Sequence, residues 1–368
     1  MKKTLLAAAV VSALVASTAV SAATVYDKDG TTLNVNGRIE AQWYNAGSSN
    51  NMTGEVANND SSIYNWARMG MDGRSKINDY ATAFGFMEFD VGDGDRSTGK
   101  GQFAARDQYI GVDFGKFGTV KTGRYHSLLH TVVIATDVLG GDGMSGKAFA
   151  IGSDRNAGKL TYTWNGYGVL LGAEYQAAKD GYKDVNDFKA EGGYSLIAGY
   201  TTPAVLFGPI SVKAGYTKIF GQDDSNKKSY IDNQSGYAAS LSWGVPSQGL
   251  YLATEYSRSK LVSRKPTPTN DATGVEFAAK YSFDNGLSLA TAYQFYKVEK
   301  DGTEYKSSQI PVVAEYSFNP NFIVYAQAAF GLSDSEYKTG EIVHDAPDGI
   351  DPTYGDGNAF AVGARYTF

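Results

Sequence analysis

The sequence predicts an all-β chain, a 16-stranded antiparallel transmembrane β-barrel, and three observations lead to that prediction. A short apolar leader opens the chain, segments with a period of two residues recur along the rest, and the links between these segments are alternately short and long. Mean hydropathy is −0.30 with 42% hydrophobic residues. Such a low value suits a membrane barrel, because only every second residue of its strands meets lipid.

The N-terminus has the order of a secretory signal peptide. Two lysines precede an apolar stretch at 5–20, and small residues follow at 21–23. A stretch this short, ended by a small-residue site, is typical of a cleaved leader, whereas a membrane helix needs about 20 apolar residues. We predict a signal peptide at 1–22, cleaved after Ala22, and one barrel domain at 23–368.

Charge and cysteine content narrow the classes of function. The formal net charge is −6, and loss of the leader would remove two lysines and no acid. A nucleic-acid partner needs a concentrated basic patch, and the sequence has no run of Lys or Arg longer than a pair. We therefore expect no nucleic-acid partner. Cysteine is absent, so stability after export cannot depend on a disulfide.

Alternation is clearest at 33–43. Its apolar phase contains Leu33, Val35, Ile39, Ala41 and Trp43, and its polar phase contains Asn34, Asn36, Arg38, Glu40 and Gln42. This pattern predicts a strand with one apolar and one polar face. The same period recurs at 275–283 and 360–368. In a barrel with a wet lumen the polar face points inward.

Sixteen such segments are expected, an even number as in single-chain bacterial barrels. They lie at 33–44, 62–76, 81–91, 103–113, 118–125, 157–164, 167–177, 190–201, 208–220, 234–244, 249–260, 272–283, 286–298, 308–318, 321–332 and 357–368. Tight turns fall at 165–167, 284–286 and 319–320, and long polar links fall at 45–61, 92–102, 126–156, 178–189, 221–233, 261–271, 299–307 and 332–356. Short periplasmic turns and long extracellular loops alternate in this way in membrane barrels. Pro311 is out of place, because it removes a ladder hydrogen bond inside a predicted strand.

Aromatic residues gather near the ends of the predicted strands, as at Tyr281, Phe283, Tyr366 and Phe368. Amphipathic rings prefer the headgroup level of a bilayer. One such pair alone is readily explained by cross-strand packing, but recurrence beside the turns favours a membrane interface. Phe368 also ends the last alternating segment, which resembles the C-terminal signature that the barrel assembly machinery recognises.

Several short motifs stand in a particular order along the chain. They are ATVYDKDG at 23–30, NWARMG at 65–70, FGKFGTV at 114–120 leading to Gly123-Arg124, TDVL at 136–139, Gly141-Asp142 and ARYTF at 364–368. In this order they resemble the general diffusion porins of Gram-negative outer membranes, and they cover the whole of 23–368. The resemblance implies an outer-membrane channel through which small hydrophilic solutes and ions diffuse passively.

The resemblance also implies a homotrimer, surrounded by outer-membrane lipid and lipopolysaccharide, with a third extracellular loop at 126–156 folded into each lumen. By motif position, the pore constriction would have a basic side and an acidic side: Arg38, Arg68, Arg106 and Arg155 on the wall, and Asp137 and Asp142 on the loop. Porins of this family carry a Pro-Glu-Phe segment between those two acids. Here the chain runs Leu139-Gly140-Gly141, so we expect a less acidic loop face and a wider pore.

Periodicity alone places several polar residues on the inner face. Arg38 and Arg68 share the polar phase of their segments with Glu40 and Gln42, and Glu88 lies on the polar phase of 81–91. Without the resemblance, solvated side chains of a wet interior are the simpler interpretation. With it, opposed charges across a narrow gap would create a transverse field that orients dipolar solutes and water.

Other motifs could indicate different chemistry. The stretch 94–101 nearly matches a phosphate-binding loop, but it lacks the final Ser or Thr and a following helix. The acids at 90–95 lack the glutamate that completes a calcium loop. His126 and His130 have helical spacing without the HExxH motif of zinc enzymes. We expect no cofactor, no metal and no enzymatic activity.

Two other kinds of barrel remain open. A substrate-selective channel, for example for oligosaccharides, would need an aromatic track along the lumen, and the polar-phase aromatics Trp66 and Tyr251 form no evident track. A surface adhesin or structural barrel would have a plugged lumen and no conductance. Single-channel recording with and without sugars distinguishes the three.

Overall fold

The computed structural model describes residues 22–46, 62–92, 103–139, 155–180, 189–222, 231–263, 270–300, 303–332 and 358–368. Its strands are β1 (Ala23–Lys28), β2 (Thr31–Ala46), β3 (Ser62–Asn78), β4 (Ala81–Gly92), β5 (Phe103–Asp113), β6 (Thr119–His126), β7 (Arg155–Gly166), β8 (Val169–Gln176), β9 (Ala190–Val205), β10 (Gly208–Gly221), β11 (Ile231–Val245), β12 (Gln248–Ser263), β13 (Asn270–Ser282), β14 (Leu287–Lys300), β15 (Thr303–Asn319), β16 (Phe322–Gly331) and β17 (Asn358–Thr367). Three short helical turns accompany them: η1 (Gly115–Phe117), α2 (His130–Val133) and η2 (Ile134–Thr136).

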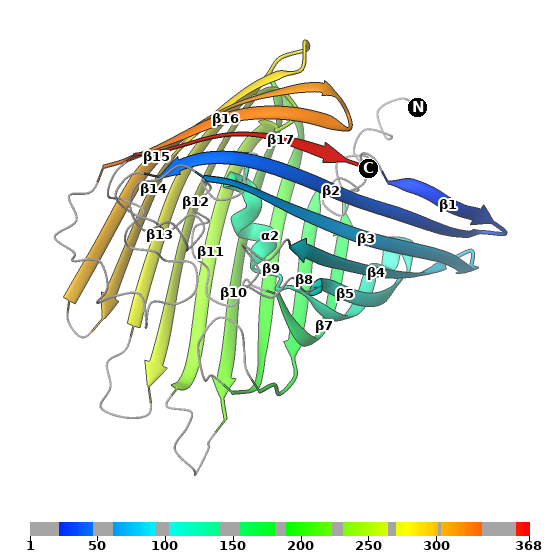
Figure 1. The fold of residues 1–368 in the computed structure, drawn as a ribbon. Coiled ribbons are helices and arrows are strands. Elements are labelled where there is room, and N and C mark those ends of the chain that lie inside the picture. The colour runs from blue at the N-terminus through cyan, green and yellow to red at the C-terminus, as the bar shows by residue number, and fades with distance from the viewer. Residues whose placement is uncertain are drawn as a thin grey trace.

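The strands β2 to β17 form a closed ring of sixteen antiparallel neighbours (Figure 1). Each strand pairs with the next along the chain, and β17 returns to pair with β2. Closure pairs the backbone groups that an open edge would expose, which lipid requires because it offers no hydrogen-bond partners. The fold predicted from alternation, a 16-stranded barrel, is confirmed.

The ring closes on β2, whose two halves have different partners. Residues 38–46 pair with β17, and residues 31–35 pair with the short β1. Between the halves, the Gly37 amide donates to the Phe368 carbonyl at 2.8 Å, and the Phe368 amide donates to the Gly37 carbonyl at 2.9 Å. The last residue of the chain therefore lies beside the beginning of the barrel.

The two faces of the sheet differ in composition, as β12 illustrates. Tyr251, Glu255 and Ser257 are buried on one face, while Leu252 and Tyr256 are exposed on the other. An exposed apolar face around a closed ring suits lipid, so the polar face is the inner one. In the part of the chain that the structure describes, no helix is both long enough and apolar enough to span a membrane.

The helical segment after β6 packs against the inner face of the far wall. One buried cluster comprises Leu128, Leu129, Val132, Val133, Ile197 and Ala238, and a second comprises Val138, Leu139, Tyr251, Ala253, Ala278, Ala290, Ala292 and Val313. Leu129 and Val132 are fully buried. Burying an aliphatic side chain of this size contributes about 1.5–3 kcal/mol, so residues 127–139 are held firmly on the wall.

Most strand ends differ from the prediction by a few residues, and two differences are larger. The structure adds β1, a strand of six residues that pairs with β2. The long link predicted at 299–307 is wrong, because β14 runs to Lys300 and β15 begins at Thr303. At these strand ends polar residues, such as Glu299 and Glu304, occur on both faces of the sheet. The sequence there does not alternate between apolar and polar residues, so it did not predict a strand. The predicted signal peptide, apart from Ala22, lies outside the described residues.

Pro311 sits well inside β15 and not near its start. Pro311 pairs with Ala329 of β16. On the other side, the register with β14 includes Val312 and Gln309 but not Pro311. The Thr291 hydroxyl donates to the Pro311 carbonyl at 2.9 Å. A neighbouring side chain thus joins the two strands at the point where proline interrupts the ladder.

Candidate functional site

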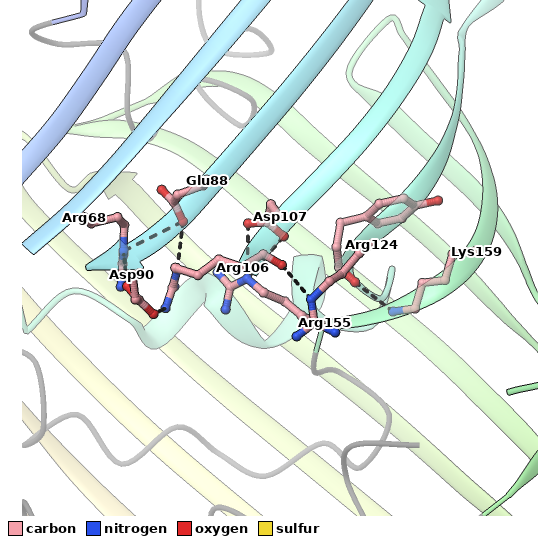
Figure 2. A network of polar contacts seen from close by, with 9 residues as sticks. Arg68, Glu88, Asp90, Arg106, Asp107, Arg124, Arg155 and Lys159 are labelled. Atoms are coloured by element: carbon pink, nitrogen blue, oxygen red, sulfur yellow. Dashed lines mark hydrogen bonds and ion pairs between the residues drawn. The ribbon is translucent and has the colours of Figure 1, made fainter. Parts of the chain in front are cut away.

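Charged side chains from β3, β4 and β5 meet on the inner face (Figure 2). Arg68 Nε donates to Asp90 at 2.9 Å and lies 3.8 Å from Glu88. Arg106 donates from Nε to Glu88 at 2.7 Å and from Nη1 to Asp90 at 3.0 Å. Glu88 and Asp90 share a face because they are two residues apart on one strand. Two arginines therefore share two carboxylates.

A β-bulge brings a further pair to the same place. Met87 pairs with Gln108 and Phe89 with Ala105, so two residues of β5, Arg106 and Asp107, stand opposite one residue of β4. A bulge re-aims side chains, and here it lets consecutive residues point inward. Asp107 accepts from Arg155 Nε at 3.1 Å.

These six residues form what we call the arginine–carboxylate row: Arg68, Glu88, Asp90, Arg106, Asp107 and Arg155. Their side chains are between 6% and 33% exposed, so they are partly desolvated. Charges in such a setting are screened less than charges on an open surface. The row holds three cations and three anions, which makes this wall a set of paired charges and not a purely basic surface.

Arg38 lies on the inner face next to the row. It is the cross-strand neighbour of Arg68, and its guanidinium carbon lies 4.2 Å from the ring centre of Trp66. The Arg68 guanidinium lies 5.0 Å from the same ring. A cation over an indole face is stabilised by the ring quadrupole. Trp66 is itself buried, so this polar-phase aromatic supports two arginines and offers no open surface to a solute.

On the far wall a pair of buried glutamates holds the helical segment. Glu255 and Glu276 are direct cross-strand neighbours on β12 and β13. The Thr136 hydroxyl is hydrogen-bonded to Glu276 and lies 3.3 Å from Glu255. Tyr251 donates to the carbonyl of Ala135 at 2.7 Å. The predicted acid Asp137 follows Thr136 directly, while Asp142 lies outside the described residues.

The other predicted lumen residues are buried in side-chain networks. Glu40 accepts from Arg365 Nε at 2.7 Å and from the Tyr325 hydroxyl, and it is fully buried. Gln42 is 1% exposed and Glu88 is 5% exposed. The structure thus gathers Arg68, Arg106, Arg155 and Glu88 in one row, with Arg38 beside it, and places Glu40 apart in a network with β16 and β17.

Sequence reasoning missed two members of the row, and although Glu255 and Glu276 fall on the inward-facing phase, nothing in the sequence indicated their contact with Thr136. Asp90 and Asp107 pair with the arginines, yet nothing in their spacing marks them as partners. Asp90 was available to the period-two argument, since it shares a phase with Glu88. Asp107 was not, because only the bulge turns it inward.

No group of three or more metal-ligating side chains occurs within the described ranges. His126 and His130 stack face to face, with ring centres 3.7 Å apart and an interplanar angle of 10°. Their helical spacing is explained by this contact, which joins the end of β6 to the start of α2.

Removing the Thr136 hydroxyl should loosen the helical segment. In Thr136→Val the shape is nearly kept, but Glu276 and Glu255 lose their shared donor, and an unsatisfied buried acceptor costs about 1–3 kcal/mol. We expect noisier open-channel current and a lower urea midpoint for unfolding. Thr136→Ser keeps the hydroxyl and is the matched control. Equal behaviour of the two variants would show that the hydroxyl does not hold the segment.

Comparisons with known proteins agree with the barrel fold. The outer membrane porin protein OmpD of Salmonella typhimurium strain LT2 is 29% identical over the full length of both chains. Porin PhoE of Escherichia coli K12 is 28% identical, covering 92% of this chain and 95% of its own. Among solved structures, Salmonella typhi OmpF in complex with daunomycin superposes with a TM-score of 0.73 at 21% identity, covering 94% of this chain and 100% of its own. Vibrio cholerae OmpT in a trimer form gives 0.63 at 18%, covering 92% and 100%. A sequence model of Gram-negative porins matches residues 7–336, and the chain belongs to that family.

Proposed function

We propose that this chain forms a water-filled channel through the outer membrane, by which small hydrophilic solutes and ions cross by passive diffusion. The observation that carries the proposal is the closed ring of sixteen strands whose inner face is polar and charged while its outer face is apolar. A barrel of this strand number is wide enough to leave an aqueous channel. Diffusion through it needs neither a cofactor nor catalytic chemistry, so we infer that the protein is not an enzyme.

The narrow part of this channel lies between the arginine–carboxylate row and the helical segment. The loop 126–156 would cross the lumen there, with Asp137 and Asp142 facing Arg38, Arg68, Arg106 and Arg155. Support comes from residues 127–139, which pack on the inner face of β10–β13. Asp137 lies close enough to Glu276 to add to the negative charge on that side. Paired charges on the row would leave the transverse field weaker than one between purely basic and purely acidic walls.

We propose three partners, which the family and the fold support. The chain would assemble as a homotrimer, as the trimer form of the Vibrio cholerae neighbour suggests. Its apolar outer face would be surrounded by outer-membrane lipid and lipopolysaccharide. Phe368, which closes the ring against Gly37, would be the residue that the barrel assembly machinery recognises. Cleavage after Ala22 would release the barrel domain 23–368.

Single-channel recording of the purified protein in planar bilayers tests the channel directly. We expect ohmic openings in groups of three in KCl, as a trimer of separate pores requires. Conductance should scale with bulk electrolyte conductivity, because a wide wet pore binds small ions weakly. A correctly folded trimer that stays silent would rule out the channel and favour a structural barrel.

A further inference from the structure

A strip of aromatic side chains runs along the inner wall on the short-turn side of the arginine–carboxylate row. We call Phe84, Phe86, Tyr109 and Tyr125 the aromatic strip. The Tyr109 ring contacts the other three. Its centre lies 5.3 Å from that of Phe86, with which it stacks. It lies 5.7 Å from that of Tyr125 and 6.2 Å from that of Phe84, both in edge contacts. Phe84, Phe86 and Tyr109 are only half-buried, so part of their surface remains open.

The strip faces the lumen and not the membrane. Phe84 and Phe86 precede Glu88 on β4 by four and two residues, so all three share a face. Phe86 pairs across strands with Tyr109. Two residues span about 7 Å along a strand. Phe86 therefore lies about 7 Å from Glu88, toward the short-turn end of the barrel. A solute that passes the row therefore meets the strip next.

Cations border the aromatic strip. Lys121 Nζ lies 4.0 Å from the ring centre of Tyr125 and 4.9 Å from that of Tyr109. Lys159 Nζ lies 5.7 Å from the Tyr125 ring and donates to the Tyr125 carbonyl at 3.0 Å. Arg74 lies 6.0 Å from the Phe84 ring. Within the described residues no carboxylate lies within ion-pair distance of Lys121, although Glu174 and Asp107 are near enough to interact with it electrostatically.

We propose that the aromatic strip and Lys121 form a binding step for small solutes that carry both a flat aromatic ring and an anionic group. The ring of the solute would pack on Phe86 and Tyr109, where apolar surface is open to the lumen. Its anion would reach Lys121, whose ammonium lies against two ring faces and forms no close ion pair. This inference rests on the proposed channel, because solutes reach the strip only through an open lumen.

Sugars and organic cations fit the strip less well. A sugar needs free hydrogen-bonding groups beside an aromatic face, but the Tyr125 hydroxyl is already paired with Thr161 at 2.9 Å. Thr161 in turn donates to Glu174 at 2.8 Å. Asp72, Glu88 and Asp107 also act on Tyr109 and would attract an organic cation. Glu88 and Asp107 are already paired with Arg106 and Arg155, however, whereas Lys121 lies directly against the Tyr109 and Tyr125 rings and would repel it. Anionic aromatic solutes match both the open apolar surface and the positive charge of Lys121.

The test is current block in planar bilayers with the full trimer in KCl, using benzoate as the probe. We expect saturable block by benzoate, weaker block by cyclohexanecarboxylate, which lacks the flat ring, and none by acetate at equal ionic strength. Lys121→Met and Tyr109→Leu should each weaken the block about threefold to tenfold, as loss of one cation–π or aromatic contact predicts. Phe86→Leu serves if either variant fails to fold.

Lys218→Met is the matched control, because Lys218 lies 5.3 Å from the ring of Phe220 on the outer face of β10. It should leave the block unchanged. Equal block by benzoate and acetate, equal or stronger block by benzylammonium, or block by maltotriose without block by benzoate would overturn the proposal. Full KCl conductance in every variant would show that the channel is intact, so loss of the binding step and loss of the channel are distinguishable.

Discussion

Arg106→Gln should make the channel markedly more selective for cations. Arg106 donates hydrogen bonds to both Glu88 and Asp90, and its loss leaves one negative charge uncompensated on this wall. A unit charge about 4 Å from an ion in water is worth on the order of 1 kcal/mol. We therefore expect the permeability ratio of K⁺ to Cl⁻ to rise about fivefold. The zero-current potential in a tenfold KCl gradient measures it.

Two controls make this result specific. Arg258→Gln also breaks an arginine–carboxylate pair, that with Asp271, but on the outer face, and it should not move the zero-current potential. Arg106→Gln combined with Glu88→Gln restores the balance of charge and should bring selectivity back toward that of the parent. If Arg106→Gln and Arg258→Gln behave alike, the row does not line the conducting path.

Gly123→Ala should destabilise the barrel more than any surface change. Gly123 has φ +140°, a region that L side chains rarely adopt, and an added Cβ would lie 2.2 Å from the Gln108 carbonyl oxygen and 2.7 Å from Tyr109 Cα. Neither backbone atom can move without breaking the pairing of β5 and β6. Backbone strain and overpacking together should cost on the order of 3 kcal/mol. A lower urea midpoint and less heat-modifiable folded species on gels would report it.

Gly85→Ala is the matched control, since Gly85 is also a strand glycine and lies on β4, the other neighbour of β5. A Cβ there meets Ile110 at 3.8 Å, an ordinary contact. We expect a change within about 0.5 kcal/mol, as at most tolerant surface positions. Equal stability of the two variants would contradict the tight approach at Gly123.

The sequence predicted the strands well because lipid and water impose opposite demands on alternate residues. Apolar and polar residues alternate along the segment 33–43, and the observed strand β2 includes the whole of it. Prediction failed at Glu304, where the strand end carries polar residues in both phases. It also could not find β1, whose six residues are all exposed and show no alternation of burial.

The site was harder to predict for two physical reasons. Arg106 and Asp107 are consecutive, so strict alternation would turn one of them outward, and only the bulge in β5 brings both inside. Phe84 and Phe86 are apolar, which would suggest a lipid-facing phase, although Glu88 and Asp90 share their face. A polar lumen can thus contain aromatic side chains that hydrophobicity alone assigns to the wrong side.

The seam between β2 and β17 sets the order of events in assembly. Arg365 and Glu40 are joined at 2.7 Å although 325 residues separate them. Contacts so distant along the chain form late, because a very long loop must close before they can form. Until β17 docks, β2 and β16 both present unpaired edges that can recruit other chains. The barrel therefore closes only when β17 is in place, so a chain that lacks β17 should remain an open sheet exposed to aggregation and proteolysis.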